Sequence, residues 1–333
     1  MAGTIVNDNQ SGKPILFSPP LVSILIPTHN RPDLAELALK SALAQTYINI
    51  EIVINDNSDD TLTQERFAPY VERYRHIHYT RVPGCGAMEN FQFCYDRASG
   101  EYVNYLMDDD LFHPEKIQKM MSFMLAKPEI GLVTSFRQLI DANGAEIDPV
   151  AGTERTFHVD TLIGGRSLGT MILTNGHNMV GEPTTVLFRK SDASPVFGRF
   201  LEKQYTTLSD VATWLSVLSH KDGVYLPEAL SYFRIHGGQD QRSNGIKIKA
   251  NVEWLELFCD AHQRQQFLTN AGAAHDLLSS KLVTCIWFLL SVRDEVKAGA
   301  YGLDRIQAVL LQATSILFGS QHTEYAQFGE WAT

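Results

Sequence analysis

The sequence predicts an α/β fold with a mostly parallel sheet flanked by helices and a helical appendage at the C-terminal end. Residues 22–26 (VSILI) form a short β-branched apolar run that ends at Pro27, as in a strand buried on both faces of a parallel sheet. A helical pattern follows, and then a second apolar run at residues 51–55 (EIVIN). Strand, helix and strand with short connections are typical of a βαβ unit.

The first predicted helix covers residues 33–45, where Leu34, Leu37 and Ala38 share one face. Pro32 suits the first helical position, and Asp33 complements the positive end of the helix. The pattern then repeats along the chain. We expect a strand at 76–80, a helix at 88–98, a strand at 102–107 and a helix that opens at Pro114.

The second half has a mixed order of elements. Residues 131–136 and 184–190 are predicted strands, and Asn143-Gly144 is a predicted tight turn. An amphipathic helix at 207–220 precedes an extended segment at 224–236 that Pro227 interrupts. Three helical stretches near 247–268, 273–292 and 303–318 form the predicted appendage.

Composition and charge exclude several classes of protein. Hydrophobic residues make up 44% and charged residues 20% of the 333-residue chain, as in ordinary globular proteins. The net charge of −10, with no basic stripe, argues against a nucleic-acid partner. A nucleotide ligand stays compatible, because a divalent cation can neutralise a diphosphate in an acidic site.

The cysteines and the apolar segments bear on location. Cys85, Cys94, Cys259 and Cys285 lack the spacing of a disulfide framework. Residues 1–20 lack the pattern of a secretory signal, and the apolar run around Trp287 is shorter than the roughly 20 residues of a membrane span. We therefore expect a buried helix there and a cytoplasmic protein, with a peripheral contact at the inner face of the membrane left open.

Asp108, Asp109 and Asp110 are the most informative cluster. They directly follow a predicted apolar strand and precede a predicted helix, so they lie at the sheet edge where α/β proteins bind ligands. Three adjacent carboxylates repel one another, and a hard divalent cation such as Mg²⁺ or Mn²⁺ removes that cost. Asp56 directly follows the predicted strand at 51–55, in the same kind of position, where a carboxylate can accept hydrogen bonds from a ribose or a nucleobase.

Two segments of the sequence carry a family resemblance: residues 22–60 (VSILIPTHNRPDLAELALKSALAQTYINIEIVINDNSDD) and residues 100–117 (GEYVNYLMDDDLFHPEKI). Together they resemble the family 2 glycosyltransferases, which are inverting enzymes of the GT-A fold. The resemblance extends over about residues 20–240. It implies a loose segment at 1–20, a GT-A domain at 21–244 with a nucleotide-binding half (21–112) and an acceptor half (113–244), and a helical region at 245–333.

The resemblance also implies roles for individual residues. Pro27, Thr28, Asn30 and Arg31 fall on positions that line the base pocket, Asp56 falls on the base-binding Asp, and Asn90 is also assigned to the nucleotide. The acidic cluster falls on the DxD motif, which implies ribose and metal contacts for Asp108 and Asp109, with Asp110 a further candidate metal ligand. The motif can be aligned as Asp108–Asp110 or centred on Asp109, because the commonest family form has Asp where this chain has Met107.

Upstream, many relatives carry Ala-Arg-Asn where this chain has Met88-Glu89-Asn90. A positive charge near the diphosphate is therefore missing or comes from elsewhere, with Arg81 as one candidate.

Further implied residues lie in the second half. Asp210 matches the carboxylate of the family's Glu-Asp motif, with Ser209 in place of the Glu, and its task would be general base catalysis. The segment from Tyr232 to Gln239 resembles the Tyr-Arg-x-His motif. It implies that His236 is a metal ligand or diphosphate contact and that Arg234 supports the site. Glu182, in an acceptor-side loop, and Trp214, one turn past Asp210, are further acceptor-side candidates.

The expected activity is metal-assisted, inverting transfer of a sugar from a nucleotide-diphosphate sugar, UDP- or dTDP-linked, to a hydroxyl of a glycan or lipid-linked acceptor. The expected cofactor is Mn²⁺ or Mg²⁺, the expected process is polysaccharide biosynthesis, and a homodimer is compatible with the sequence. One alternative is a catalytically degenerate nucleotide-sugar-binding protein. A sugar-phosphate nucleotidyltransferase is the other, although residues 27–33 (PTHNRPD) lack the Gly-rich loop that it would need.

Overall fold

The computed structural model describes residues 5–7, 14–16, 18–150, 152–237, 243–299 and 301–319. The chain folds into two compact units. Unit 1 comprises residues up to 164 together with 179–197 and 221–236, and unit 2 comprises 165–178, 198–220 and the residues from 237 onwards. This division differs from the boundary at 244/245 expected from the sequence, because unit 2 also draws on two segments from the middle of the chain.

Unit 1 is built on a mixed sheet in the order β10-β14-β8-β11-β6-β3-β4-β5. Strands β3 (Val22–Thr28), β4 (Ile50–Asp56), β5 (Ile77–Arg81) and β6 (Tyr102–Tyr105) are parallel to their neighbours in this group, which confirms the predicted βαβ pattern. All seven residues of β3 are buried. The sequence therefore predicted this half of the sheet well, since strands buried on both faces are continuous apolar runs.

The other half of the sheet is mixed. Strand β11 (Leu187–Arg189) is antiparallel to both β6 and β8 (Ile130–Ile140), and β8 is parallel to β14 (Asp222–Arg234). The strand predicted at 184–190 is shorter, since residues Pro183–Thr185 form a 3₁₀ turn, η1. Strand β14 continues through Pro227, and its register against β8 shifts between Leu226 and Ala229. The remaining strands in this sheet are β7 (Leu111–Phe112), β9 (Glu146–Ile147) and β10 (Thr161–Ile163).

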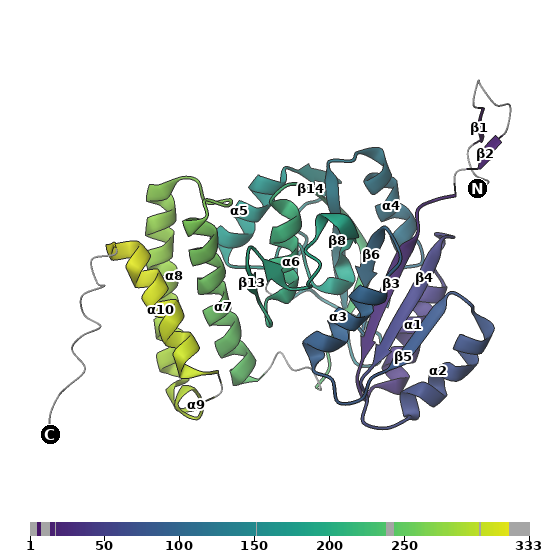
Figure 1. Cartoon of the computed structure of the whole chain (residues 1–333), viewed down its shortest axis with the longest axis horizontal. Helices are drawn as coiled ribbons and strands as arrows, with labels where there is room; N and C mark the ends of the chain where they lie inside the picture. The colour runs from purple at the N-terminus through teal and green to yellow at the C-terminus, as the bar shows by residue number, and fades with distance from the viewer. Residues whose placement is uncertain are drawn as a thin grey trace. The chain divides into compact units, whose positions relative to one another are not determined.

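The helices of unit 1 pack on this sheet, and Figure 1 shows α1 and α2 beside β3–β5. The helices are α1 (Pro32–Leu43), α2 (Leu62–Arg73), α3 (Ala87–Arg97) and α4 (Lys116–Ala126). Helix α1 begins with Pro32 and has Asp33 in its first turn, as predicted. Helix α2 was not predicted, because it contains Pro69 and buries only Thr63 and Phe67.

Unit 2 contains α5 (Gly165–Asn175), α6 (Ser209–Leu218), α7 (Asn244–Gln263), α8 (Ala271–Ser291), α9 (Arg293–Lys297) and α10 (Leu303–Phe318). Short strands β12 (Arg199–Phe200) and β13 (Lys203–Gln204) precede α6. Figure 1 shows α7, α8 and α10 side by side, and these three helices pack on one another. Helix α5 was not predicted, because Gly165 and Gly169 weaken its helical signal.

Helix α8 differs from its prediction. The run around Trp287 was expected to be a buried helix, but the indole of Trp287 is 70% exposed, and Val283, Ile286 and Leu290 are exposed on the same face. The helix has 21 residues, and an 18-residue window within it has a mean hydropathy of 1.3, so in length and composition it could cross a membrane. That property alone does not place it in one. The prediction failed because an apolar run shows that a segment is hydrophobic and does not show which of its faces meets the core.

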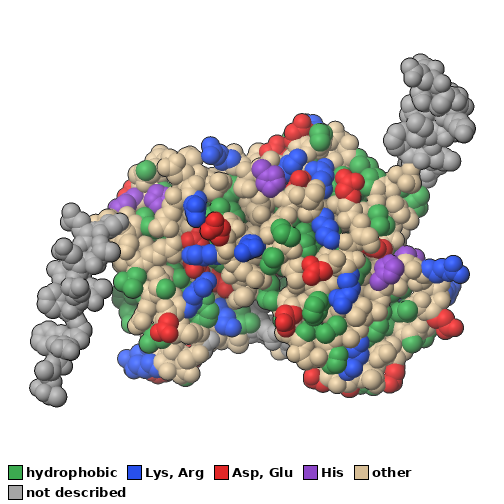
Figure 2. All heavy atoms as spheres, in the orientation of Figure 1, with side chains coloured by type: hydrophobic (Ala, Val, Ile, Leu, Met, Phe, Trp, Pro, Cys, Tyr) green, Lys and Arg blue, Asp and Glu red, His purple; other side chains and the backbone are tan. Residues whose placement is uncertain are grey.

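Near the N-terminus, where the sequence predicts a loose segment, β1 (Ile5–Asn7) and β2 (Pro14–Leu16) pair in antiparallel fashion. The other residues before 18 lie outside the described part of the chain, as do Gly238 and Gln239 of the predicted loop after His236. All four cysteines are free. On the face shown in Figure 2, Lys and Arg side chains are interspersed with Asp and Glu.

Candidate nucleotide-sugar site

The acidic cluster follows β6 in unit 1, and its three carboxylates are held in different ways. Asp108 is 4% exposed. Its Oδ2 accepts hydrogen bonds from Thr28 Oγ1 (3.0 Å) and from the backbone N–H of His29 (3.2 Å), both at the end of β3. The structure therefore brings together two strand ends that are 80 residues apart in the chain.

Arg31 lies between Asp108 and Asp109. Its Nη1 is 3.1 Å from Asp108 Oδ1 and 3.2 Å from Asp109 Oδ2. Burial, and next the charge of Asp109, raises the pKa of Asp108 to about 6, while Arg31 opposes the rise. The arginine thus offsets part of the repulsion between the two carboxylates.

Asp109 also meets His236. The imidazole Nε2 of His236, just after β14, lies 3.0 Å from Asp109 Oδ2. Both side chains are partly accessible, at 13% for His236 and 10% for Asp109. These two sequence-predicted ligands therefore converge, although they are 127 residues apart.

Asp110 has a different role. It is fully buried, and its oxygens accept hydrogen bonds from Thr184 Oγ1 (2.5 Å) and from the backbone N–H of Arg234 (3.0 Å). Burial raises the pKa of Asp110 well above its ordinary range. These contacts do not support Asp110 as a metal ligand, because both of its oxygens bind other parts of unit 1. Among the described residues, no group of three His, Cys, Asp or Glu side chains is arranged to hold a metal ion.

Arg234, predicted to support the site, is 2% exposed and binds backbone. Its Nε donates to the carbonyl oxygen of Asp109 (2.8 Å), and its Nη1 donates to those of Asp141 and Ala142. Glu182 pairs with Arg137 Nε at 2.7 Å. Arg234 thus holds the acidic loop through its backbone contacts, and its buried guanidinium is not presented to a sugar acceptor.

The predicted base-pocket residues surround the ends of β3 and β4. Asp56 is fully buried and accepts hydrogen bonds from Ser58 N (2.8 Å) and from the hydroxyl of Tyr79 (2.5 Å). Asn30 is exposed and has a backbone φ of 53°. Its Nδ2 donates to Asp59 Oδ2, and its Oδ1 accepts from the backbone N–H of Asp59. Pro27 is buried within β3.

Asn90 and Arg81 brace the loops of this region. Asn90 Nδ2 donates to Thr28 O (3.2 Å) and Asn57 Oδ1 (2.8 Å). Arg81 donates to the carbonyl oxygens of residues 58–60. The sequence pattern did not reveal that Tyr79 binds Asp56 or that Thr184 binds Asp110. A single polar residue has no local signal for a partner that is distant in the chain.

The predicted general base lies in unit 2. Asp210 is in the first turn of α6 and is partly buried. Its Oδ2 accepts from Asn178 Nδ2 (2.8 Å), and its Oδ1 accepts from the backbone N–H of Val211 (2.7 Å). Trp214, one turn further, is fully buried in this structure, as expected of a core residue and not of an acceptor platform.

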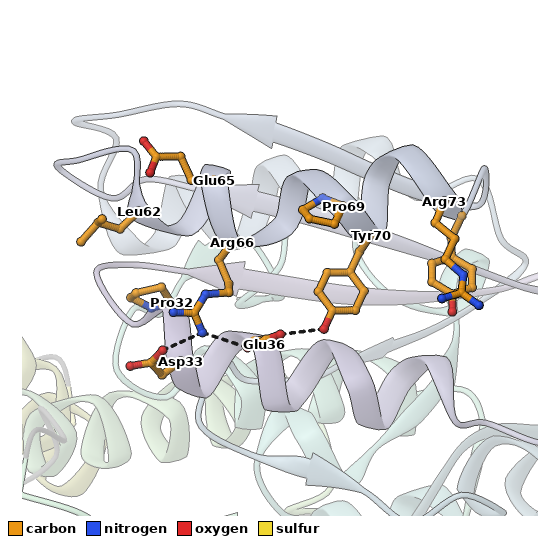
Figure 3. Close-up of a pocket in the computed structure, with 10 residues that line it drawn as sticks. Pro32, Asp33, Glu36, Leu62, Glu65, Arg66, Pro69, Tyr70 and Arg73 are labelled. Carbon is orange, nitrogen blue, oxygen red and sulfur yellow. Dashed lines mark hydrogen bonds and ion pairs between the residues drawn. The ribbon is translucent and has the colours of Figure 1, made fainter.

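A separate hollow of about 750 Å³ lies between α1 and α2. Figure 3 shows Asp33, Arg66, Glu36 and Tyr70 pointing toward one another there. Arg66 pairs with Asp33 (2.8 Å) and Glu36 (2.9 Å), and the Tyr70 hydroxyl donates to Glu36 (2.6 Å). These groups bind one another, and the residues that line the hollow do not include the acidic cluster.

The mixed sheet of unit 1 has carboxylates clustered at the carboxyl ends of its parallel strands, which is the edge where α/β sheets bind ligands. Residues 23–192, just over half of the chain, match the model of glycosyl transferase family 2. The chain therefore belongs to glycosyltransferase family 2.

Individual relatives that are named as glycosyltransferases are also similar to this chain. An uncharacterized glycosyltransferase of Rickettsia typhi is 28% identical over 264 residues, which are 78% of each chain. One of Rickettsia felis is 40% identical over 114 residues, which are 34% of this chain and only 18% of that relative. The chain thus spans less than a fifth of the length of that relative.

The fold is shared with a solved structure that contains a nucleotide sugar. Residues 1–349 of S. aureus TarS, crystallised in complex with UDP-GlcNAc, superpose with a TM-score of 0.55 at 16% identity, covering 88% of this chain and 90% of that one. This likeness shows the GT-A-type fold.

Proposed function

We propose that this protein is an inverting glycosyltransferase that moves a sugar from a UDP- or dTDP-sugar to a hydroxyl of a glycan or lipid-linked acceptor. The observation that carries the proposal is the convergence of Arg31, Asp108, Asp109 and His236 at the strand ends of a family 2 chain. That edge is the ligand-binding edge of α/β sheets.

We propose that the donor is a sugar linked to a pyrimidine nucleoside diphosphate. Asn30, Arg31 and Asp108 would hold its base and ribose, and the buried Asp56, Thr28, Pro27 and Asn90 would shape the pocket from within. The TarS complex with UDP-GlcNAc supports a UDP-sugar, since that protein has the same fold.

The residues present fit a divalent cation. The carboxylate of Asp109 and the imidazole of His236 lie 3.0 Å apart. A carboxylate suits Mn²⁺, and a neutral imidazole is the commonest metal-binding side chain. Two protein ligands are enough, because Mg²⁺ and similar ions complete their coordination with substrate phosphates and water. When bound, the ion would supply positive charge beside the leaving diphosphate.

Asp210 would act on the acceptor. It would accept the proton of the acceptor hydroxyl while that oxygen bonds to the anomeric carbon and the bond to the nucleoside diphosphate breaks on the opposite face. The hydrogen bond from Asn178 helps to orient the carboxylate for this step. We place this reaction in the cytoplasm, at or near the inner face of the membrane, as a step of polysaccharide assembly.

A donor-turnover assay tests the proposal. The protein is incubated with a panel of UDP- and dTDP-sugars in Mn²⁺ or in EDTA, and nucleotide release and calorimetric binding are both measured. We expect Mn²⁺-dependent binding and release, and Asp210→Asn should keep binding but lower release by about 10²–10⁴-fold. Water takes the sugar in this assay, since no other acceptor is added. Binding of a donor without any release of nucleotide by the parent protein would instead favour a nucleotide-sugar-binding protein that has lost its activity.

A further inference from the structure

Glu253, in α7, is a buried carboxylate that the chemistry above does not use. It is 2% exposed. Its Oε1 accepts from the backbone N–H (3.1 Å) and hydroxyl (2.9 Å) of Thr206, and its Oε2 accepts from the N–H groups of Thr207 (3.0 Å) and Leu208 (2.8 Å). All four donors belong to three consecutive residues, and none of them is charged.

Those three residues lead directly into α6. The first N–H groups of a helix have no partner within the helix, and a side chain at the N-cap usually satisfies one of them. The N-cap residue of α6 is Leu208, which has no capping side chain. Glu253, 45 residues away in the chain, accepts the N–H of this N-cap residue and so holds the backbone where it enters α6. A negative charge is also favourable at this end of a helix.

Asp210 follows Leu208 by two residues and lies in the first turn of the same helix. Its carboxylate accepts hydrogen bonds from Val211 N, within that turn, and from Asn178. The direction of the Asp210 side chain thus depends on the backbone that Glu253 holds. Both residues belong to unit 2.

We infer that Glu253 is a positioning residue for the general base: its hydrogen bonds to residues 206–208 hold the first turn of α6 and so orient Asp210. The catalytic part of this inference rests on the proposed function, in which Asp210 accepts the acceptor's proton.

Helix α7 offers a matched control. Glu256, one turn after Glu253, is also buried, at 3% exposed. It pairs with Lys203 Nζ (3.1 Å) and Arg305 Nη2 (2.6 Å), outside the 206–208 segment. Glu253→Gln and Glu256→Gln therefore make the same chemical change on the same helix, and only the first places an amide N–H₂ group where the segment before α6 needs an acceptor.

Amide hydrogen exchange gives a test that needs no substrate. In Glu253→Gln, the amides of residues 206–212 should exchange at least about tenfold faster than in the parent, because the first turn of α6 opens more often. In Glu256→Gln they should stay within about twofold of the parent. Unchanged exchange over 206–212 in a folded Glu253→Gln protein would overturn the inference, whatever the enzyme does.

Kinetics test the link to Asp210. With the nucleotide sugar that the donor panel selects, Glu253→Gln should lower kcat by about tenfold or more while donor KM stays within about twofold, since the donor site is in unit 1. Glu256→Gln should lower kcat by no more than about twofold. Equal kcat losses in both variants would assign Glu253 a general stabilising role and overturn the positioning assignment.

A double-mutant cycle separates the two proposals. If Glu253 acts through Asp210, Glu253→Gln should have little further effect in the Asp210→Asn background. Additive losses would overturn the inference while leaving the proposed function intact. If Asp210→Asn alone turns over as fast as the parent, Asp210 is not the base, and both that assignment and the catalytic role of Glu253 fail.

Discussion

Asp109 and Asp110 are neighbours in the chain, yet their surroundings give them different tasks. Asp109 faces His236 and Arg31, whereas Asp110 joins Thr184 to the backbone of Arg234. A short acidic motif thus combines one partly accessible carboxylate with one that is fully buried and holds the loop. Only the contacts of each oxygen distinguish them.

Asp109→Asn should abolish the Mn²⁺-dependent part of UDP binding and leave the melting temperature within a few degrees of the parent. The amide is nearly isosteric, but it is a much weaker metal ligand than a carboxylate. Asp110→Asn is the matched control, and it should mainly lower the melting temperature, because the buried acceptor of the Thr184 and Arg234 bonds is changed. Calorimetric titration of UDP with and without Mn²⁺ checks both, and full Mn²⁺-dependent binding by Asp109→Asn would remove Asp109 from the metal site.

Glu36 should contribute a pH-dependent part of the stability. Hydrogen bonds from Tyr70, Arg66 and Lys40 lower the pKa of Glu36 from 4.5 to about 2. Because the folded-state pKa is below the unfolded-state pKa, the contribution is complete above about pH 4.5 and is lost as the pH falls through about 2. With allowance for solvent screening, we expect about 1 kcal/mol.

Urea unfolding of Glu36→Gln and of the parent tests this expectation. The difference in unfolding free energy should be largest at pH 7 and smaller at pH 3. Glu65, in the same hollow, accepts only the Thr61 hydroxyl among its side-chain hydrogen bonds in the described chain, so Glu65→Gln is a suitable control. A gap that is the same at both pH values would show that Glu36 stabilises the protein through packing and not through its charge.

At the scale of elements, α8 shows how a helix can present two apolar faces. Ala274, Leu278, Leu282, Cys285 and Leu289 are buried, and Val283, Ile286, Trp287 and Leu290 are exposed on another side. A sequence rich in apolar residues all round has a weak amphipathic signal, so the buried face cannot be recognised from periodicity alone.

Tryptophan fluorescence can check the orientation of α8. The Trp287 indole is 70% exposed and the Trp214 indole is fully buried. Trp287→Phe should therefore remove emission that acrylamide quenches readily, whereas Trp214→Phe should remove emission that acrylamide hardly reaches. Stern–Volmer plots of the two variants against the parent give the measurement, and equal changes in both would contradict the arrangement of α8.

At the scale of the whole molecule, the two units are interleaved along the chain. Unit 2 takes α5 and the segment with α6 from the middle of the sequence and completes itself with the helices after residue 243. Helix α7 is central to it: Asp260 accepts from the Tyr205 hydroxyl (2.6 Å) and pairs with Lys203 (2.8 Å), close to the residues that Glu253 binds. The C-terminal helices are thus part of the same unit as Asp210.

A fragment ending at residue 244, the domain boundary expected from the sequence, should therefore fold poorly. It would leave Tyr205 and Leu208, both buried in the intact chain, without α7, and it would lose buried hydrogen bonds that contribute about 1 kcal/mol each. We expect a broader, lower melting transition and stronger binding of a hydrophobic dye than in the full chain. A fragment that melts as sharply and at the same temperature as the full chain would show that residues 21–244 are an independent domain.

The sequence by itself determined the βαβ half of the sheet and the strand ends with Asp56 and Asp108–Asp110. These follow from local signals, since buried parallel strands are apolar runs and their carboxyl ends meet at one edge. That His236 belongs with the acidic cluster was implied only by the resemblance to the family. The tertiary structure alone decided that Asp110 and Arg234 hold the loop, that Glu253 binds the segment before α6, and that one face of α8 is exposed. Each of these depends on which distant residue fills the space beside a side chain, and a polar or apolar residue in a sequence does not specify its partner.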